Sequence, residues 1–246
     1  MNLSIIVPSI RTYNWKNWID CIINSCKRYS YEIIFIGPEY SSEIEKYRNI
    51  KYVRDFGHPN RCQQIGILIA EGEYVTFGSD DCMYKPDLID KCLDIAYFNK
   101  LDYMTTGYNE GGNIAVSNFT IRNCYQSGKN VEQNWIIFNS VFIQRNILEK
   151  YNLDTNFSVT CIGHTDLACR VQSDKLLRGA ILNENIMECS HMPGRTGDHG
   201  PICDAQTFID GPAFFNKYNQ DKIPTDIIDW KEWKNNTHQV WKERFE

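Results

Sequence analysis

Two adjacent carboxylates, Asp80 and Asp81, are the clearest indication of chemistry in this 246-residue chain. They follow a short apolar run, residues 74–77, and a helix-like segment begins soon after them at Pro86. Like charges at the end of a buried strand are costly unless a positive group lies beside them. Carboxylates placed in this way suit Mg²⁺ or Mn²⁺, whose coordination is completed by waters and substrate phosphates. The alternative is a helix N-cap or an exposed turn, where aspartate is also common.

The elements before this pair predict where it lies. Strand-like runs at 3–7, 31–37, 50–56 and 74–77 alternate with helix-like segments, one of which begins at Asn60 and carries Ile65, Leu68 and Ile69 on one face. This alternation predicts an α/β fold with a mostly parallel sheet flanked by helices. Ligands bind such sheets outside the carboxyl ends of the strands. Asp80 and Asp81 are therefore expected on a ligand-binding rim.

The second half of the chain is less regular. Residues 101–123, 135–143 and 180–191 are strand-like, while residues 145–151 and 163–177 are helix-like. Residues 192–212 are rich in glycine, proline and polar side chains, which predicts a long loop of the kind that acts as a lid. Because no repeat or linker is present, a single domain is expected over residues 1–246.

Composition narrows the class of protein. The net charge is −5, from 26 basic and 31 acidic residues, and without a basic block a nucleic-acid partner is excluded. The start, "MNLSIIVPSI", lacks a basic leader, and no apolar run approaches the roughly 18 residues of a transmembrane helix. A cytoplasmic location is therefore expected. The ten cysteines form no C-x-x-C pair, so we expect reduced, buried thiols rather than a zinc site.

Three segments carry a resemblance to a known family. "LSIIVPS" at the start, "QQIGILIAEGEYVTFGSDD" at 63–81 and "PDLI" at 86–89 together resemble glycosyltransferase family 2, which has the GT-A fold. The likeness covers residues 2–98 and continues more loosely over 138–157. It implies a mixed, mostly parallel GT-A sheet and a metal-dependent, inverting transferase. The donor would be a nucleotide-diphosphate sugar, most simply a UDP-sugar, and the acceptor a hydroxyl on a glycan, a lipid-linked glycan or a protein.

The resemblance also divides the chain. It implies a nucleotide-sugar-binding half over residues 1–100 and an acceptor half over 101–212, which includes the loop 192–212. A C-terminal helical tail would follow over 213–246, with Trp230, Trp233 and Trp241 among its charges. These tryptophans either dock on a membrane surface, pack onto the domain or mediate self-association.

The implied metal site consists of Asp80 and Asp81, which match the family's "DD". One would hold Mn²⁺ or Mg²⁺, and the other the ribose or a metal-bound water. Gly78 stands where the family has a further aspartate, so another ligand is needed. We predict His191, at the end of a strand, with His199 as the alternative.

The implied nucleotide contacts come from the other strand ends. Pro8 and Ser9 match the loop that lies against the base, and Arg11 on the same loop is included with them. Glu39 lies where the family often has an acidic group that accepts from uracil N–H. Arg61 either contacts the phosphate or base in place of the family's displaced arginine, or is an exposed residue at a helix start.

The implied acceptor base lies in "GHTDLACR", residues 163–170, which resembles the family's "EDxDLxxR". Strict alignment makes His164 the base, whereas a slip makes it Asp166. Arg195 is placed to reach the leaving diphosphate from the loop 192–212.

Two further functions compete with glycosyl transfer. A sugar-1-phosphate nucleotidyltransferase would need a glycine-rich loop after the first strand, but "PSIRTYNWKNW" contains no glycine. A non-catalytic sugar-nucleotide or glycan-binding module is suggested by Gly78 and the weak "ED" match.

Overall fold

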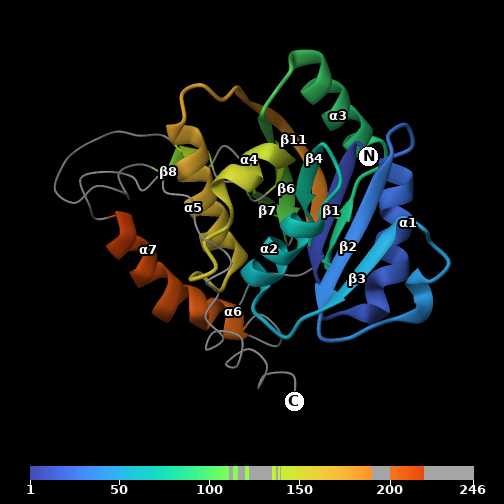
Figure 1. Ribbon diagram of the computed structural model, residues 1–246, viewed down its shortest axis with the longest axis horizontal. Helices are drawn as coiled ribbons and strands as arrows, with labels where there is room; N and C mark the ends of the chain where they lie inside the picture. Colours follow the sequence, from blue (N-terminus) through green and yellow to red (C-terminus); the bar gives the residue numbers. More distant parts are fainter. Residues whose placement is uncertain are drawn as a thin grey trace.

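A mixed β-sheet runs through the computed structural model, with helices packed on both of its faces (Figure 1). The structure describes residues 1–110, 113–115, 120–121, 135–136, 138, 140–189 and 200–218. The strand order is β3-β2-β1-β4-β10-β6-β11-β5, with β7 paired to β6. The predicted α/β class with a mixed, mostly parallel sheet is thus confirmed as a single domain.

The first half of the sheet is parallel. It contains β1 (Leu3–Pro8), β2 (Tyr31–Gly37), β3 (Ile50–Arg54) and β4 (Tyr74–Phe77). Two backbone hydrogen bonds join neighbouring strands at their carboxyl ends. Ser9 N donates to Ile36 O and Gly78 N donates to Ile6 O, both at 2.8 Å. The carboxyl ends therefore meet at one rim, as the alternation of elements predicts.

The second half of the sheet is mixed. β10 (Val141–Gln144) lies antiparallel between β4 and β6 (Tyr103–Glu110), and β11 (Gly179–Cys189) runs parallel to β6. The short strand β5 (Cys82–Tyr84) pairs antiparallel with the end of β11. The remaining described strands are β7 (Asn113–Ala115), β8 (Thr120–Ile121) and β9 (Trp135–Ile136). β5 matters most for the site, because it brings the end of β11 beside the two aspartates.

Helices cover the two faces of the sheet (Figure 1). One face packs against α1 (Trp15–Ser25) and α3 (Leu88–Asn99), and the other against α2 (Pro59–Ile69), α4 (Arg145–Tyr151) and α5 (Thr160–Ser173). Trp15 stacks on Phe35 of β2 with ring centroids 4.2 Å apart. This stacking fixes the start of α1 against the sheet, next to the rim.

The buried face of α2 differs from the prediction. Leu68 and Ile69, expected inside, are 38% and 36% exposed, whereas Gln63 and Gln64 are buried. Gln64 is satisfied inside because its amide donates to Asn152 Oδ1 and its oxygen accepts from Leu153 N, both at 2.7 Å. The apolar pattern predicts the wrong face because hydrogen-bonded amides can replace apolar side chains in a core.

Residues 200–212, expected to belong to a long loop, are helical. The described elements are α6 (Gly200–Ala205), a π-helical turn (Gln206–Asp210) and α7 (Gly211–Tyr218). The prediction is wrong here because Pro201 and Pro212 lie in first helical turns, which tolerate proline. In Figure 1 the orange and red helices α6 and α7 lie beside α5. None of the described helices has the length and apolar character required to span a membrane.

Candidate functional site

The candidate site lies at the rim where β1 and β4 end, and Asp80 is the residue that organises it. Its Oδ2 accepts hydrogen bonds from Ser9 Oγ at 2.9 Å, from Ile10 N at 3.0 Å and from Arg11 N at 2.8 Å. Asp80 is only 2% exposed. Because one carboxylate oxygen binds three donors of the same segment, Asp80 fixes the path of the chain after β1.

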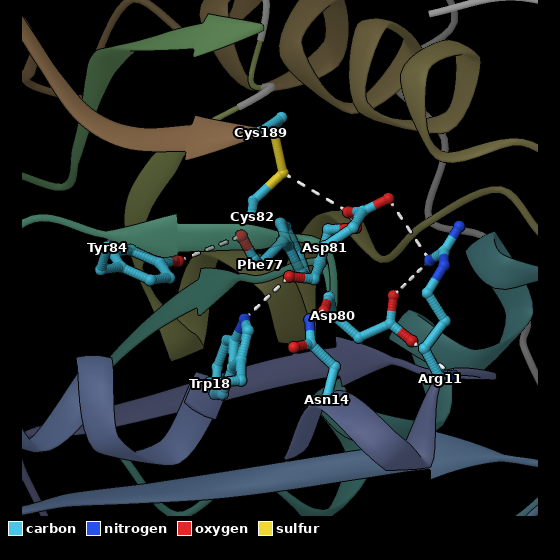
Figure 2. Close-up of a disulfide and its surroundings, with 10 residues drawn as sticks. Arg11, Asn14, Trp18, Phe77, Asp80, Asp81, Cys82, Tyr84 and Cys189 are labelled. Carbon is cyan, nitrogen blue, oxygen red and sulfur yellow. Dashed lines mark hydrogen bonds and ion pairs between the residues drawn. A yellow bond between two sulfur atoms is a disulfide. The ribbon is translucent and has the colours of Figure 1, made fainter. Parts of the chain in front are cut away.

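Arg11 is the positive group beside the two aspartates. Its Nη1 lies 2.5 Å from Asp80 Oδ1 and 3.3 Å from Asp81 Oδ2, as Figure 2 shows. The side chain of Arg11 is 15% exposed and that of Asp81 is 12% exposed. The guanidinium therefore offsets the repulsion between the paired carboxylates.

Two side chains near the start of α1 hold the turn that carries the aspartates, and a third holds Ser9 of the loop after β1. Trp18 Nε1 donates to Ser79 O at 2.8 Å, and Asn14 Nδ2 donates to Asp80 O at 2.5 Å (Figure 2). Trp15 Nε1 donates to Ser9 Oγ at 2.6 Å. Asn14 occupies the N-cap position of α1, but its side chain makes no cap hydrogen bond and instead bonds the aspartate turn.

Gly78 has a packing reason to lack a side chain. A Cβ at this position would lie 2.8 Å from Trp18 Cζ2 and 3.2 Å from Val7 Cγ2. The indole therefore occupies the volume that an aspartate would need. The departure from the family's acidic motif follows from this neighbour.

A disulfide lies directly beside Asp81. Cys82 and Cys189 are directly opposite residues of β5 and β11, and their sulfurs are bonded (Figure 2). Cys82 Sγ lies 3.5 Å from Asp81 Oδ1, which also accepts a hydrogen bond from the Ser79 hydroxyl. The prediction of reduced thiols is thus wrong for this pair. Among the other described cysteines the prediction of buried thiols holds for Cys26, Cys62, Cys92 and Cys169, whereas the thiols of Cys21, Cys161 and Cys203 are only partly buried.

Whether these residues fit a divalent cation depends on which oxygens are accessible. Asp81 is 12% exposed, with Ser79 on Oδ1 and Arg11 facing Oδ2 across 3.3 Å, whereas Asp80 is 2% exposed and accepts four hydrogen bonds from the segment after β1. Within the part of the chain that the structure describes, no three His, Cys, Asp or Glu side chains gather closely enough to bind a metal. The described residues therefore fit a cation held through Asp81 and completed by waters and phosphates.

Several predicted site residues lie outside the described residues. They are His191, its alternative His199, Arg195 and the tail tryptophans Trp230, Trp233 and Trp241. Their roles stay predictions.

The remaining nucleotide candidates lie on the same rim. Pro8 ends β1 beside the buried Ser9, and Glu39 is exposed just after β2. Arg61 binds Asp55 at the end of β3, with Nη2 3.1 Å from Oδ2. Arg61 is therefore held at the rim by a carboxylate rather than being an exposed residue of the helix start.

His164 on α5 is buried against β4. Its Nε2 lies 2.7 Å from Gln63 Oε1, so Nε2 carries the hydrogen and donates it. The ring stacks on Phe77 with centroids 4.8 Å apart. Burial lowers the pKa of His164 from its ordinary 6.5 to about 3. The imidazole is therefore neutral near pH 7 and only weakly basic.

Asp166, two residues further along α5, is fully buried in an ion-pair network. Its Oδ2 accepts from Arg170 Nε at 2.8 Å, and its Oδ1 accepts from Lys217 Nζ of α7. Arg170 also donates to backbone carbonyls after α4, including Asn152 O at 2.7 Å. Oδ1 of Asp166 thus joins α5 to α7, whereas Oδ2 holds Arg170 of the same helix, which in turn binds the carbonyls after α4.

The mixed sheet with helices on both faces gives the chain a GT-A-type α/β fold. Among solved structures, the chain is similar to the crystal structure of S. aureus TarS 1–349, with a TM-score of 0.56 and 14% identity over 77% of this chain. Its similarity to TarS 1–349 in complex with UDP has a TM-score of 0.55 at 13% identity over 76% of the chain. For the complex with UDP-GlcNAc the TM-score is 0.52 at 15% identity over 81% of the chain.

These likenesses concern the fold. The chain spans 60% of TarS 1–349 and 37% of a longer TarS structure. No protein-family model matches the chain, and no curated protein matches it in sequence. The GT-A fold is therefore supported by structure, whereas membership of glycosyltransferase family 2 stays a prediction.

Proposed function

We propose that the chain is a glycosyltransferase that moves a sugar from a nucleotide-diphosphate donor to a hydroxyl acceptor. The observation that carries this proposal is the Arg11–Asp80–Asp81 cluster at the carboxyl ends of parallel strands. This edge is where α/β sheets bind nucleotides. The same fold is found in TarS, which has been solved with UDP and with UDP-GlcNAc.

The donor side of the site suits charge development on a leaving diphosphate. Asp81 would hold Mn²⁺ or Mg²⁺, which when bound supplies Lewis-acid stabilisation of the leaving group. Arg11 supplies a second positive charge from the neighbouring loop. Asp80 holds the Arg11 amide and the Ser9 hydroxyl, so the backbone of this loop needs little rearrangement when the donor binds.

The acceptor side needs a base on the opposite face of the sugar, since inverting transfer is an in-line displacement. His164 is unprotonated near neutral pH, as a base must be, although its low pKa makes it weak. Asp166 can accept a proton only after Lys217 moves away from Oδ1. The two residues therefore remain the candidates, and they differ in whether α7 must move.

UDP is the proposed nucleotide. An exposed Glu39 after β2 is available to accept from a uracil N–H, and the TarS complexes contain uridine nucleotides. The transferred group would be a hexosyl or N-acetylhexosaminyl unit. The acceptor would be a glycan, a lipid-linked glycan or a protein hydroxyl, in the cytoplasm or at the membrane surface.

A thermal-shift screen of nucleotide sugars with and without Mn²⁺ tests the proposal. UDP-sugars with Mn²⁺ should raise the melting temperature of the wild type, and Asp81→Asn should abolish the metal-dependent part of the shift. Asp20→Asn, which alters an exposed carboxylate paired with Lys16 on α1, is the matched control. An unchanged metal dependence in Asp81→Asn would contradict the metal bridge.

A non-catalytic binding module is the second candidate. Gly78 and Gly163 both stand where the family has acidic residues. At each of them a neighbouring side chain fills the space that a Cβ would need. A binding module would shift in melting temperature with UDP-sugars but release no UDP over time. Release of UDP from the donor, measured with wild-type protein and Mn²⁺ in water and with added glycan hydroxyl acceptors, decides between the two functions.

A further inference from the structure

We propose that the Arg11 guanidinium changes partners when the site is loaded. It neutralises Asp81 in the empty site, and it moves to the donor's diphosphate when a divalent cation binds Asp81. The inference rests on the proposed function and deepens it. It assigns different roles to the two adjacent aspartates: Asp80 positions Arg11, and Asp81 exchanges one cation for another.

The backbone of Arg11 is fixed whereas its guanidinium bridges two anions. Its amide donates to Asp80 Oδ2 at 2.8 Å, which anchors the start of the side chain. At the far end, Nη1 lies 2.5 Å from Asp80 Oδ1 and 3.3 Å from Asp81 Oδ2. The contact with Asp81 is the longer of the two and is therefore the weaker in Coulomb terms.

Asp80 is poorly suited to exchange its partners. Besides Arg11, it binds the Ser9 hydroxyl and the Ile10 amide, and only 2% of it is exposed. A cation that took Asp80 Oδ2 would break three hydrogen bonds of the loop after β1. Each of these bonds is charge-assisted, so the cost would be high.

Asp81 can exchange its partner at a lower cost. Its Oδ1 is held by the Ser79 hydroxyl, and its Oδ2 faces Arg11 across 3.3 Å. A divalent cation on Oδ2 would bring two positive groups to one oxygen, and they repel each other. The repulsion is relieved if the guanidinium turns to a new anion. In a loaded site the metal-bound diphosphate is that anion, and guanidinium matches phosphate oxygens well.

Arg11 should therefore couple the two ligands. It opposes a divalent cation that binds without nucleotide, because both cations compete for Asp81. It favours the nucleotide once the metal is present, because the displaced guanidinium gains a phosphate partner. By linkage, metal and nucleotide then strengthen each other's binding through Arg11.

The test compares wild type, Arg11→Gln and Arg11→Lys in two binding measurements. Titration with Mn²⁺ alone, followed by the paramagnetic resonance of free Mn²⁺, reports the competition at Asp81. Calorimetric titration with UDP at saturating Mn²⁺ reports the diphosphate contact. Arg28→Gln is the matched control, because Arg28 pairs with Asp94 and Asp90 away from the rim.

The two affinities of Arg11→Gln should move in opposite directions. Mn²⁺ alone should bind several-fold more tightly than in wild type, while UDP with Mn²⁺ should bind roughly tenfold or more weakly. Arg11→Lys keeps the charge but not the planar fork, so its UDP affinity should fall between the two. Arg28→Gln should match wild type in both titrations.

Changes of the same sign refute the inference. If Arg11→Gln weakens both ligands, Arg11 only supports the loop, and if it alters neither, Arg11 takes no part in binding. Arg11→Lys gives the same decision should Arg11→Gln fail to fold. Wild type that binds no UDP even with Mn²⁺ would overturn the proposed function itself, whereas UDP binding that ignores Arg11 overturns this inference alone.

Discussion

Removal of the Cys82–Cys189 disulfide should lower the free energy of unfolding by about 2–5 kcal/mol. The two cysteines are 107 positions apart, so the bond closes a long loop of the unfolded chain. The chain-entropy relation for a loop of that length gives about 4.7 kcal/mol at 25 °C, and measured values are commonly lower. The bond also ties the short strand β5 to β11 beside Asp81.

This change in free energy corresponds to a measurable shift in melting temperature. The average entropy of unfolding is about 2.1 cal/mol/K per residue, which gives about 0.5 kcal/mol/K for a chain of 246 residues. A loss of 2–5 kcal/mol then lowers the melting temperature by about 4–10 °C for two-state unfolding.

Scanning calorimetry of wild type and of the double variant Cys82→Ala/Cys189→Ala, each with and without a thiol reductant, checks the prediction. Reductant should lower the melting temperature of wild type and leave the double variant unchanged. Cys21→Ala, which removes a partly buried free thiol of α1, is the control and should respond to reductant as wild type does.

Two results would refute the reasoning. Titration of ten thiols in unreduced, denatured protein would mean that no bond forms and that the cysteines are all reduced. A bonded wild type whose melting temperature equals that of the double variant would instead show that loop closure contributes nothing measurable.

Three further predictions concern Gly78 and two buried ionisable residues of α5, Asp166 and His164. Gly78→Asp must displace the Trp18 indole, so urea denaturation should show a loss of about 1–3 kcal/mol. Asp166→Asn leaves the buried Arg170 without its anion and should cost about 3–5 kcal/mol in the same assay. Burial lowers the pKa of His164 from 6.5 to about 3, so the unfolded chain binds the extra proton between these pH values. The contribution of His164 to stability should therefore fall as pH drops below 6.5, by up to about 1.4 kcal/mol per pH unit. Burial also lowers the pKa of His58, to about 4, so urea denaturation should show a shallower but not flat pH dependence in His164→Gln.

The first half of the fold is predictable from the sequence because its elements are local. Each parallel strand is a contiguous apolar run, and β2 and β4 have the predicted bounds. In α3 the apolar residues at helical spacing, Ile89, Cys92, Leu93 and Ala96, are all fully buried. Parallel strands joined by helices place their carboxyl ends together, so the rim follows from the order of elements.

The features that the sequence analysis missed depend on contacts between distant residues. Gln63 and Gln64 are buried in α2 because partners from residues 152–164 satisfy their amides. β5 is a three-residue strand that exists through its pairing with β11, and the disulfide depends on that register. Arg11 is included among the nucleotide-binding residues, but its pairing with Asp80 joins positions 69 apart. No periodicity in the sequence reports such pairs.

At both glycines that stand where the family has an acidic residue, a neighbouring side chain fills the space that the acid would need. At Gly78 the neighbouring volume belongs to Trp18, and at Gly163 it belongs to the buried Asn60 carboxamide, which donates to Asp154 O at 2.7 Å. An acidic side chain at either position would have to displace Trp18 or Asn60, and each of these donates a hydrogen bond to a backbone carbonyl. Since Asp80 is also committed to the loop after β1, the negative charge accessible among the described residues of the cluster is concentrated on Asp81, opposite Arg11. A site with one accessible carboxylate and one arginine depends more on that arginine than a site with several carboxylates does. Substitution of Arg11 is therefore the most direct test of the donor site.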